Sequence, residues 1–443
     1  MPPSAAIRFA SLTDVGVKRS HNQDACAVQP AADPSVWRAQ GHVFIVADGM
    51  GGHAVGEKAS AKAVRDIPLT YLKHVVQEGV PAAVRRAFTE ANQSIHAIGL
   101  NNPEFKGLGT TGTALFLRPE GAWVGHVGDS RAYRVRGGRV HQLTFDHSWV
   151  WEVARRQGID PDELGDFKRN VIIRSLGPDS DVEVDIEGPH PVEPGDVFLL
   201  CSDGLSNVVG PDEIGAVVTA FGPEDACRYL VNLANLRGGP DNITCLIAVV
   251  PDGSANGKAA GGGGVLAAID RVVPWPFAAL GLGAVLAGVS VWLQMAEAKA
   301  VAIPAFVAAA GLILGGLVGL YSYLRKRTEE ADTQAAEPPA ELHLYRDYGF
   351  VVGKELYDKF TILHVGVRDA VKERNLAVDW PAHDNQAAAA EAAAAKGDWT
   401  TAFRDRFVAL QAVATAYHKH LAKDETFRPN WMPHDKPAGG SKD

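Results

Sequence analysis

The chain has 443 residues, of which 46% are apolar and 21% charged, and its formal net charge is −9. This composition excludes a collagen, a coiled coil and a wholly disordered chain, and the length allows two or three domains. The acidic balance argues against nucleic acid as a partner, because a phosphate-binding surface needs a basic stripe. The four cysteines are far apart with no CxxC pair, which predicts reduced thiols rather than a zinc site or a disulfide framework.

The first 250 residues alternate short β-rich runs with turn signals, while helical periodicity falls in separate blocks. Strands are predicted at 7–12, 43–47, 113–117, 122–127, 132–136, 139–143, 197–201 and 243–250, and helices at 54–66, 80–98 and 223–236. Gly137-Gly138 predicts a hairpin turn between two of the strands. Neighbouring strands joined by hairpins favour an antiparallel sandwich with helices on its faces over a doubly wound sheet.

Four aspartates lie at or next to the ends of predicted apolar strands: Asp24, Asp48, Asp203 and Asp241. A single Asp-Gly pair is usually only a turn. Four carboxylates that converge at one sheet end would repel one another, so a positive group is predicted between them. A set of oxygen ligands without His or Cys suits Mg²⁺ or Mn²⁺, and Gly49 leaves room for a backbone carbonyl to approach such an ion.

Six motifs, in this order along the chain, resemble those of the metal-dependent type 2C (PPM-type) protein serine/threonine phosphatases. The motifs are Arg19-Ser20-His21-Asn22-Gln23-Asp24, Asp48-Gly49-Met50-Gly51-Gly52-His53, Gly109-Thr110-Thr111, Gly128-Asp129-Ser130-Arg131, Ser202-Asp203-Gly204 and Gly239-Pro240-Asp241-Asn242. The resemblance covers about residues 7–250. It implies an α+β fold, an α-β-β-α sandwich of two antiparallel sheets flanked by helices, with a binuclear Mn²⁺/Mg²⁺ centre at one end.

The resemblance also implies a role for each acid of the motifs. Asp48 would bridge two ions, and the carbonyl of Gly49 would bind one of them. Asp203 and Asp241 would hold one ion, while Asp24 would act mainly through water.

A third, weaker metal site is implied where Asp129 would join Asp203, so that two or three Mn²⁺ or Mg²⁺ ions are expected. The stretch from Asp146 to Gly177 resembles the family's flap, which borders the cleft and influences substrate choice.

The predicted catalytic residues are Arg19, Asp48 and Asp203. Two dications that share a water would lower its pKa and direct a bridging hydroxide at phosphorus. The planar fork of Arg19 suits it to bind the phosphoryl oxygens, although a surface ion pair is the plainer alternative for this residue. Met50 stands where many relatives carry a proton-donating His, so the general acid is unassigned.

Two stretches without charge, 272–296 and 300–324, are each longer than the roughly 20 helical residues that are needed to cross the hydrocarbon core of a membrane. They predict a transmembrane hairpin over 272–324 in contact with the lipid bilayer, with small residues at every fourth position that could also form a membrane-helix dimer. A buried helical pair is the alternative. The basic residues Arg271 and 325–327 place both termini in the cytoplasm, which predicts a multi-pass protein of the cytoplasmic (inner) membrane.

The chain is thus divided into five parts. These are a phosphatase-like domain (1–250), a Gly-rich linker (251–271), the hairpin (272–324), an acidic Ala/Pro linker (325–340) and a cytoplasmic helical segment (341–443). In the last segment, Gly397-Asp398 predicts a helix stop followed by a new N-cap. A small helical bundle is favoured there over a tetratricopeptide-type pair, because such repeats need about three copies.

Two functions remain open at this point. The first is a membrane-anchored phosphatase acting on phosphoserine and phosphothreonine of phosphorylated proteins and opposing a serine/threonine kinase. The second is a membrane-tethered adapter that binds phosphoproteins with little turnover. Loss of Asp203 or Asp241 would favour the adapter, and both are present. The sequence therefore favours the enzyme.

Overall fold

The computed structural model describes residues 7–51, 56–105, 107–164, 171–251, 275–295, 303–304, 306–320 and 345–424. The chain forms two compact units, one of residues 1–253 together with 342–443 and one of residues 254–341. The predicted linkers at 251–271 (apart from Pro251) and 325–340, and also His53, lie outside the described residues.

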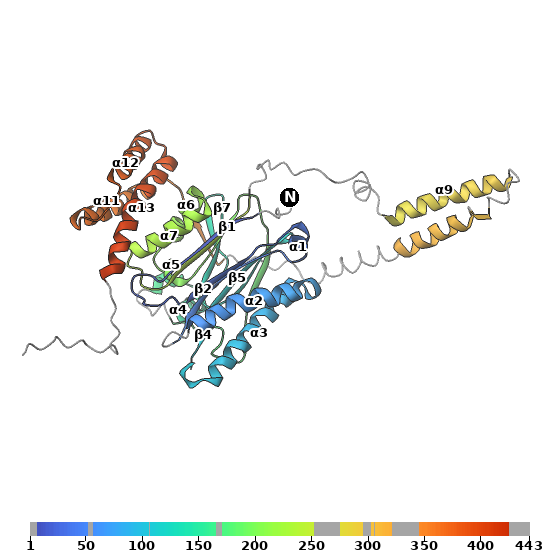
Figure 1. Cartoon of the computed structure of the whole chain (residues 1–443), viewed down its shortest axis with the longest axis horizontal. Helices are drawn as coiled ribbons and strands as arrows, with labels where there is room; N and C mark the ends of the chain where they lie inside the picture. Colours follow the sequence, from blue (N-terminus) through green and yellow to red (C-terminus); the bar gives the residue numbers. More distant parts are fainter. Residues whose placement is uncertain are drawn as a thin grey trace, which may run out of the picture. The chain divides into compact units, whose positions relative to one another are not determined.

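The first unit contains two antiparallel sheets (Figure 1). One sheet has the order β1 (Arg8–Asp14), β11 (Ile243–Val249), β10 (Val197–Cys201), β7 (Arg131–Arg136), β8 (Arg139–Gln142) and β12 (Arg346–Gly349). The other has the order β2 (Asp24–Gln29), β3 (His42–Met50), β5 (Gly112–Arg118), β6 (Gly121–Val127) and β9 (Asp185–His190), with β4 (Gly109–Thr110) beside β3.

Helices cover the outer face of each sheet. Helices α2 (Gly56–Glu78) and α3 (Val80–Asn101) share a core with the β3 sheet, and α6 (Pro211–Ala220) and α7 (Pro223–Leu236) share one with the β10 sheet. A third core, including Phe44, Leu115, Phe198 and Leu246, lies between the sheets. Shorter helices are α1 (Pro34–Ala39), η1 (Pro103–Phe105), α4 (Trp149–Gln157), η2 (Pro161–Leu164) and α5 (Asp203–Ser206). The predicted four-layer sandwich is confirmed.

The eight predicted strands and the hairpin turn are confirmed, because their apolar patterns match buried sheet faces. Gly137 and Gly138 join β7 to β8 with φ values of 55° and 75°, the left-handed backbone that such a turn requires. Helix α2 is longer than predicted and continues through Pro68 to Glu78. Buried Tyr71 and Val75 anchor its second half, so tertiary packing outweighs the hydrogen bond lost at proline.

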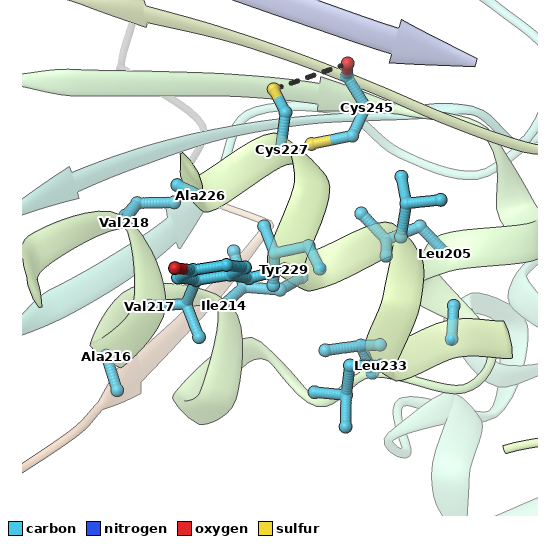
Figure 2. Packing of buried hydrophobic residues seen from close by; sticks show 14 of the residues in the cluster. Leu205, Ile214, Ala216, Val217, Val218, Ala226, Cys227, Tyr229, Leu233 and Cys245 are labelled. Atoms are coloured by element: carbon cyan, nitrogen blue, oxygen red, sulfur yellow. Dashed lines mark hydrogen bonds between the residues drawn. The ribbon is translucent and has the colours of Figure 1, made fainter. Parts of the chain in front are cut away.

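The four cysteines are free thiols, as predicted. Figure 2 shows the core of α6 and α7, where the thiol of Cys227 donates to the carbonyl of Cys245 at 3.6 Å. Burial raises the pKa of Cys201 to about 12, and this thiol is therefore inert as a nucleophile.

The C-terminal segment packs on the β10 sheet and its helices, a contact that the sequence did not predict. It contributes β12 and then α11 (Lys354–Glu373), α12 (Trp380–Ala395) and α13 (Trp399–Asp424). The ring of Phe407 lies 5.8 Å from that of Phe221 and 5.7 Å from that of Tyr229 on α7. The amine of Lys359 lies 2.9 Å from the buried carboxylate of Glu213.

The junction between α12 and α13 agrees with its sequence. Gly397 has φ +76°, a left-handed conformation that ends α12 without a Cβ clash. The side chain of Asp398 then accepts from the amide of Thr401 at 3.1 Å, as an N-cap does. The stop and the new N-cap predicted here are confirmed.

The predicted membrane location is wrong. Among the residues that the structure describes, no helix combines the length and the apolar character needed to cross a membrane. The uncharged stretches contain α9 (Trp275–Met295) and the helical residues 306–320. The prediction rested mainly on two uncharged windows of about 25 residues each. In the second window the longest run of helical residues that the structure describes is 306–320, which is shorter than the roughly 20 residues needed to cross a hydrocarbon core. The multi-pass inner-membrane assignment, the hairpin at 272–324, its bilayer contact and its dimer therefore lack support.

The buried ring of Phe407 gives the first test, because it contacts both the C-terminal helices and α7. Phe407→Ala should lower the free energy of unfolding of the full chain by about 3–5 kcal/mol, since it leaves a cavity where these elements meet. Chemical denaturation measures this loss. Ile362→Ala, at an α11 position that is 75% exposed, is the control and should change stability by less than about 0.5 kcal/mol. A loss as small as the control's for Phe407→Ala would contradict this packing.

Candidate metal centre

The predicted acids come together at one end of the sandwich. Asp24 opens β2 and lies directly opposite Asp48 of β3 in the antiparallel register. Asp203 follows β10 as the first residue of α5, and Asp241 lies just before β11. Asp129 lies in the turn between β6 and β7. Sequence positions more than 200 residues apart thus supply one cluster.

The electrostatics of the cluster show how close these carboxylates lie. Burial raises the pKa of Asp48 well above its ordinary value, and the charges of Asp24, Asp203, Asp129 and Asp241 raise it further. Burial, with the charges of Asp203 and Asp241, raises the pKa of Asp24 to about 6. Burial, with the charges of Asp241 and Asp146, raises the pKa of Asp203 to about 6 as well. The pKa of Asp129 is also raised well above its ordinary value, by burial and then by Asp203. The protein alone does not neutralise this group of acids.

Hydroxyl groups fix one oxygen of Asp24 and leave the other without a partner. Ser202 Oγ and Thr244 Oγ1 each donate to Asp24 Oδ2 at 2.7 Å. Among the described residues, the buried Oδ1 atoms of Asp24, Asp129 and Asp203 have no hydrogen-bond partner. Buried carboxylate oxygens without donors are costly unless a cation binds them.

These oxygens and their mutual repulsion fit hard divalent ions, which prefer carboxylate ligands. Within the described ranges, no group of three or more His, Cys, Asp or Glu side chains has an arrangement that could hold a metal ion. The structure therefore shows the convergence of charge, and the assignment of ligands to individual ions is made below as a proposal.

Gly49 lies where β3 passes very close to the start of α2. A Cβ at this position would stand 2.2 Å from the carbonyl oxygen of Gly56 and 2.5 Å from that of Gln23, so no side chain fits. The amide of Gly49 donates to the Gln23 carbonyl at 3.1 Å. Close backbone packing thus requires glycine next to Asp48.

Arg19 lies beside the acids, with its side chain 53% exposed. Its guanidinium donates to Asp241 Oδ2 at 2.8 Å. This hydrogen bond raises the pKa of Arg19, and the charges of Asp48 and Asp203 raise it further. An exposed guanidinium in the field of the cluster can turn toward a bound anion.

A second set of contacts fixes the turn that carries Asp129. Gly128 has φ +115°, and its amide donates to His147 Nδ1 at 3.0 Å. Since Nδ1 accepts, the proton of the neutral ring is on Nε2, which donates to Asp185 at 2.9 Å. Arg131 binds Asp146 through two parallel hydrogen bonds of 3.0 and 2.7 Å.

Sequence reasoning gave no role to the residues that support the acids. Besides Ser202 and Thr244, they include Thr111, whose hydroxyl accepts from the amide of Asp48 at 2.8 Å. Asn242 donates to the carbonyls of Val15 and His21 at 2.9 Å each and joins the loops around the cluster. The available signal was position, because Ser202 and Asn242 directly adjoin motif acids and Thr111 lies within a motif itself.

Comparisons with known proteins agree with this geometry. The family model for protein phosphatase 2C matches residues 17–224. The chain is 38% identical over 244 residues to protein phosphatase PhpP of Streptococcus pneumoniae, an alignment that covers 54% of this chain and 95% of PhpP. It is 33% identical over 240 residues to serine/threonine phosphatase stp of Listeria monocytogenes, covering 53% of this chain and 92% of that protein.

A solved serine/threonine phosphatase of S. agalactiae aligns with 33% identity and a TM-score of 0.50, covering 55% of this chain and 100% of that one. The chain therefore belongs to the protein phosphatase 2C family, whose members are hydrolases dependent on Mn²⁺ or Mg²⁺.

The crowding of charge predicts how stability depends on pH. The folded pKa of Asp24, about 6, is above its unfolded value, so the stability contributed by its protonated form is present at about pH 4 and is lost as pH rises through 6. Asp24→Asn removes this charge and keeps an acceptor for Ser202 and Thr244. In a chelator, it should raise the free energy of unfolding at pH 8 by about 1–3 kcal/mol, and by much less near pH 4.

Urea denaturation at the two pH values measures this difference. Asp181→Asn, at an exposed position away from the cluster, is the control and should have little effect at either pH. Equal stability of Asp24→Asn and the wild type at pH 8 would show that the acids do not strain the metal-free fold.

Proposed function

We propose that this chain hydrolyses phosphoserine and phosphothreonine on proteins, with two or three Mn²⁺ or Mg²⁺ ions at the cluster of acids. The observation that carries the proposal is the convergence of buried carboxylates, of which Asp24, Asp129 and Asp203 each have an Oδ1 atom without a donor among the described residues. Membership of the protein phosphatase 2C family and the serine/threonine phosphatase names of the relatives support the substrate class.

In this proposal, one residue set holds the ions. The ligands are Asp24, Asp48, the carbonyl of Gly49, Asp203 and Asp241, with Asp129 and Asp203 at a third position. When bound, the ions supply Lewis-acid activation of water and neutralise charge at a phosphoryl group. The chain's own contribution is to hold these oxygens in place, and the 2.7 Å bonds from Ser202 and Thr244 to Asp24 do so.

Arg19 binds the phosphoryl group of the substrate. Its guanidinium is already near the cluster, and half of its surface is exposed to an incoming anion. A planar fork can bind two phosphoryl oxygens at once and orient phosphorus toward the metal site. The bond to Asp241 holds the side chain close to this position before substrate arrives.

The adapter alternative is not favoured. Binding without turnover needs no buried cluster of mutually repelling acids, whereas metal-dependent hydrolysis does. Phosphorylated serine and threonine are products of a kinase, so an enzyme of that class must act before this one on the same substrates.

Metal removal gives the direct test of the enzyme. With Mn²⁺, the full chain should hydrolyse p-nitrophenyl phosphate and a phosphothreonine peptide, and a chelator should abolish both activities. Asp203→Asn should lower kcat by at least about 100-fold, because it removes a ligand charge and leaves the fold intact. Release of phosphate measures both. Asp181→Asn should retain wild-type activity, and a phosphopeptide that binds without turnover would support the adapter instead.

Arg19 is tested separately from the metal ligands. Arg19→Ala should raise KM for the phosphopeptide about 10-fold or more, since one charge-assisted contact to the phosphoryl group is lost. Arg19→Lys should restore part of this loss, because it keeps the charge without the fork. Steady-state kinetics at saturating Mn²⁺ give both values. An unchanged KM in Arg19→Ala would leave this arginine as a surface ion pair only.

A further inference from the structure

Strand β12 is added to the edge of the β10 sheet by a segment far along the chain from its neighbour β8. Arg346 pairs with Gln142, Asp347 with His141, and the pairing is antiparallel. Since side chains alternate along a strand, Arg346 and Asp347 point to opposite faces. The two side chains differ accordingly, at 9% and 35% exposed.

The buried side of β12 binds the segment of α4 and η2, residues 149–164. The guanidinium of Arg346 forms ion pairs with Asp160 and with Asp162, the latter at 3.0 Å. It also lies over the ring of Trp151, 4.9 Å from the ring centre. These contacts connect one C-terminal arginine to both helices of the segment.

Tyr345 adds a second connection on the same side. Its hydroxyl donates to Glu187 of β9 at 2.8 Å, and its ring centre lies 5.7 Å from that of Phe145, which lies shortly before the segment. Tyr345, next to β12, therefore contacts one residue before and one residue after 149–164 along the chain.

The same segment forms a wall of the hollow beside the acids. Trp151, Pro161 and Asp162 line this hollow together with Asp129 and Asp203. The guanidinium of Arg131, which binds Asp146, lies over the ring of Trp151, 5.5 Å from the ring centre. Trp151 and Asp162, both contacts of Arg346, thus line the same hollow as two acids of the cluster.

We propose that Arg346 is a positioning residue, which anchors residues 149–164 to the C-terminal strand. It thereby fixes the position of the wall that these residues form beside the acids, and a protein substrate contacts this wall. The inference rests on the proposed function for its kinetic part. Arg346 does not touch the reacting atoms, so it acts through Trp151, Asp160 and Asp162. A small aryl phosphate needs only the metal site, whereas a peptide also needs the wall.

The first measurement is hydrogen exchange on the full chain. In Arg346→Gln, the amides of residues 150–157 and 162–164 should exchange about 10-fold faster than in the wild type, because the contacts with β12 are lost. Asp347→Asn is the matched control. It removes the ion pair with Arg139 from the opposite face of the same strand and should leave those amides unchanged.

The second measurement compares two substrates. Arg346→Gln should lower kcat/KM for a phosphothreonine peptide by about 5- to 10-fold, mainly through KM, and that for p-nitrophenyl phosphate by less than about 2-fold. The double variant Asp160→Asn/Asp162→Asn should give the same loss. Combining it with Arg346→Gln should add nothing further, as expected for residues that act through one contact.

Equal exchange in Arg346→Gln and the wild type would overturn the proposal. So would the same fold-loss on both substrates, or the same changes in Asp347→Asn, since either result would indicate general damage to the fold. If the wild type with Mn²⁺ hydrolyses neither substrate, the proposed function fails, and the exchange rates alone then decide whether Arg346 holds the segment.

Discussion

Mutual repulsion among Asp24, Asp48, Asp129, Asp203 and Asp241 is the constraint on which the rest of the phosphatase domain depends. Burying such a group without cations opposes folding, because charge is desolvated and like charges are brought together. The sandwich withstands this because Asp48, Asp129, Asp203 and Asp241 adjoin strands whose apolar residues are largely buried. The partly buried β2, which carries Asp24, pairs with one of these strands, β3. The stability of the sheets holds in place a site that is unfavourable by itself.

The supporting hydrogen bonds are directional as well as stabilising. Asp24 accepts two hydroxyl bonds on one oxygen, and its other oxygen is left toward the cluster. The amide and carbonyl of Asp48 are bound to Thr111 and Thr110, so its backbone cannot shift when charge at the site changes. A fixed backbone, with an unpartnered oxygen on each of Asp24, Asp129 and Asp203, is the arrangement that a metal centre needs before the metal arrives.

The acids and most of the strands could be predicted from the sequence because both signals are local. An aspartate at the end of an apolar run is visible without knowing which strands pair. The supporting residues are less visible, since Ser202 and Thr244 resemble ordinary turn and strand residues until the register of β10 and β11 places both beside Asp24. His147 gives no local signal either, because its partners Gly128 and Asp185 come from separate turns and strands.

The membrane assignment failed for a related reason. The uncharged windows, the small residues at every fourth position and the terminal aromatic rings are all local signals, whereas crossing a bilayer demands one continuous apolar helix of roughly 20 residues. That assignment also separated residues 341–443 from the domain that they join. Their amphipathic pattern did predict helices with a buried face, but no local pattern states which surface covers that face.

The return of the C-terminal segment to the β10 sheet is thermodynamically reasonable despite the long stretch of chain before it. The entropic cost of closing a loop grows only by about 0.6 kcal/mol for each doubling of its length. Burial of Phe360, Phe403 and Phe407 outweighs such a cost many times over. Once docked, the segment supplies β12 as an edge strand, and the side chain of Arg346 on that strand contacts residues 149–164. A segment outside the phosphatase fold thus positions part of the surface beside the acids. A change in this segment can alter the choice of substrate while the acids themselves stay the same.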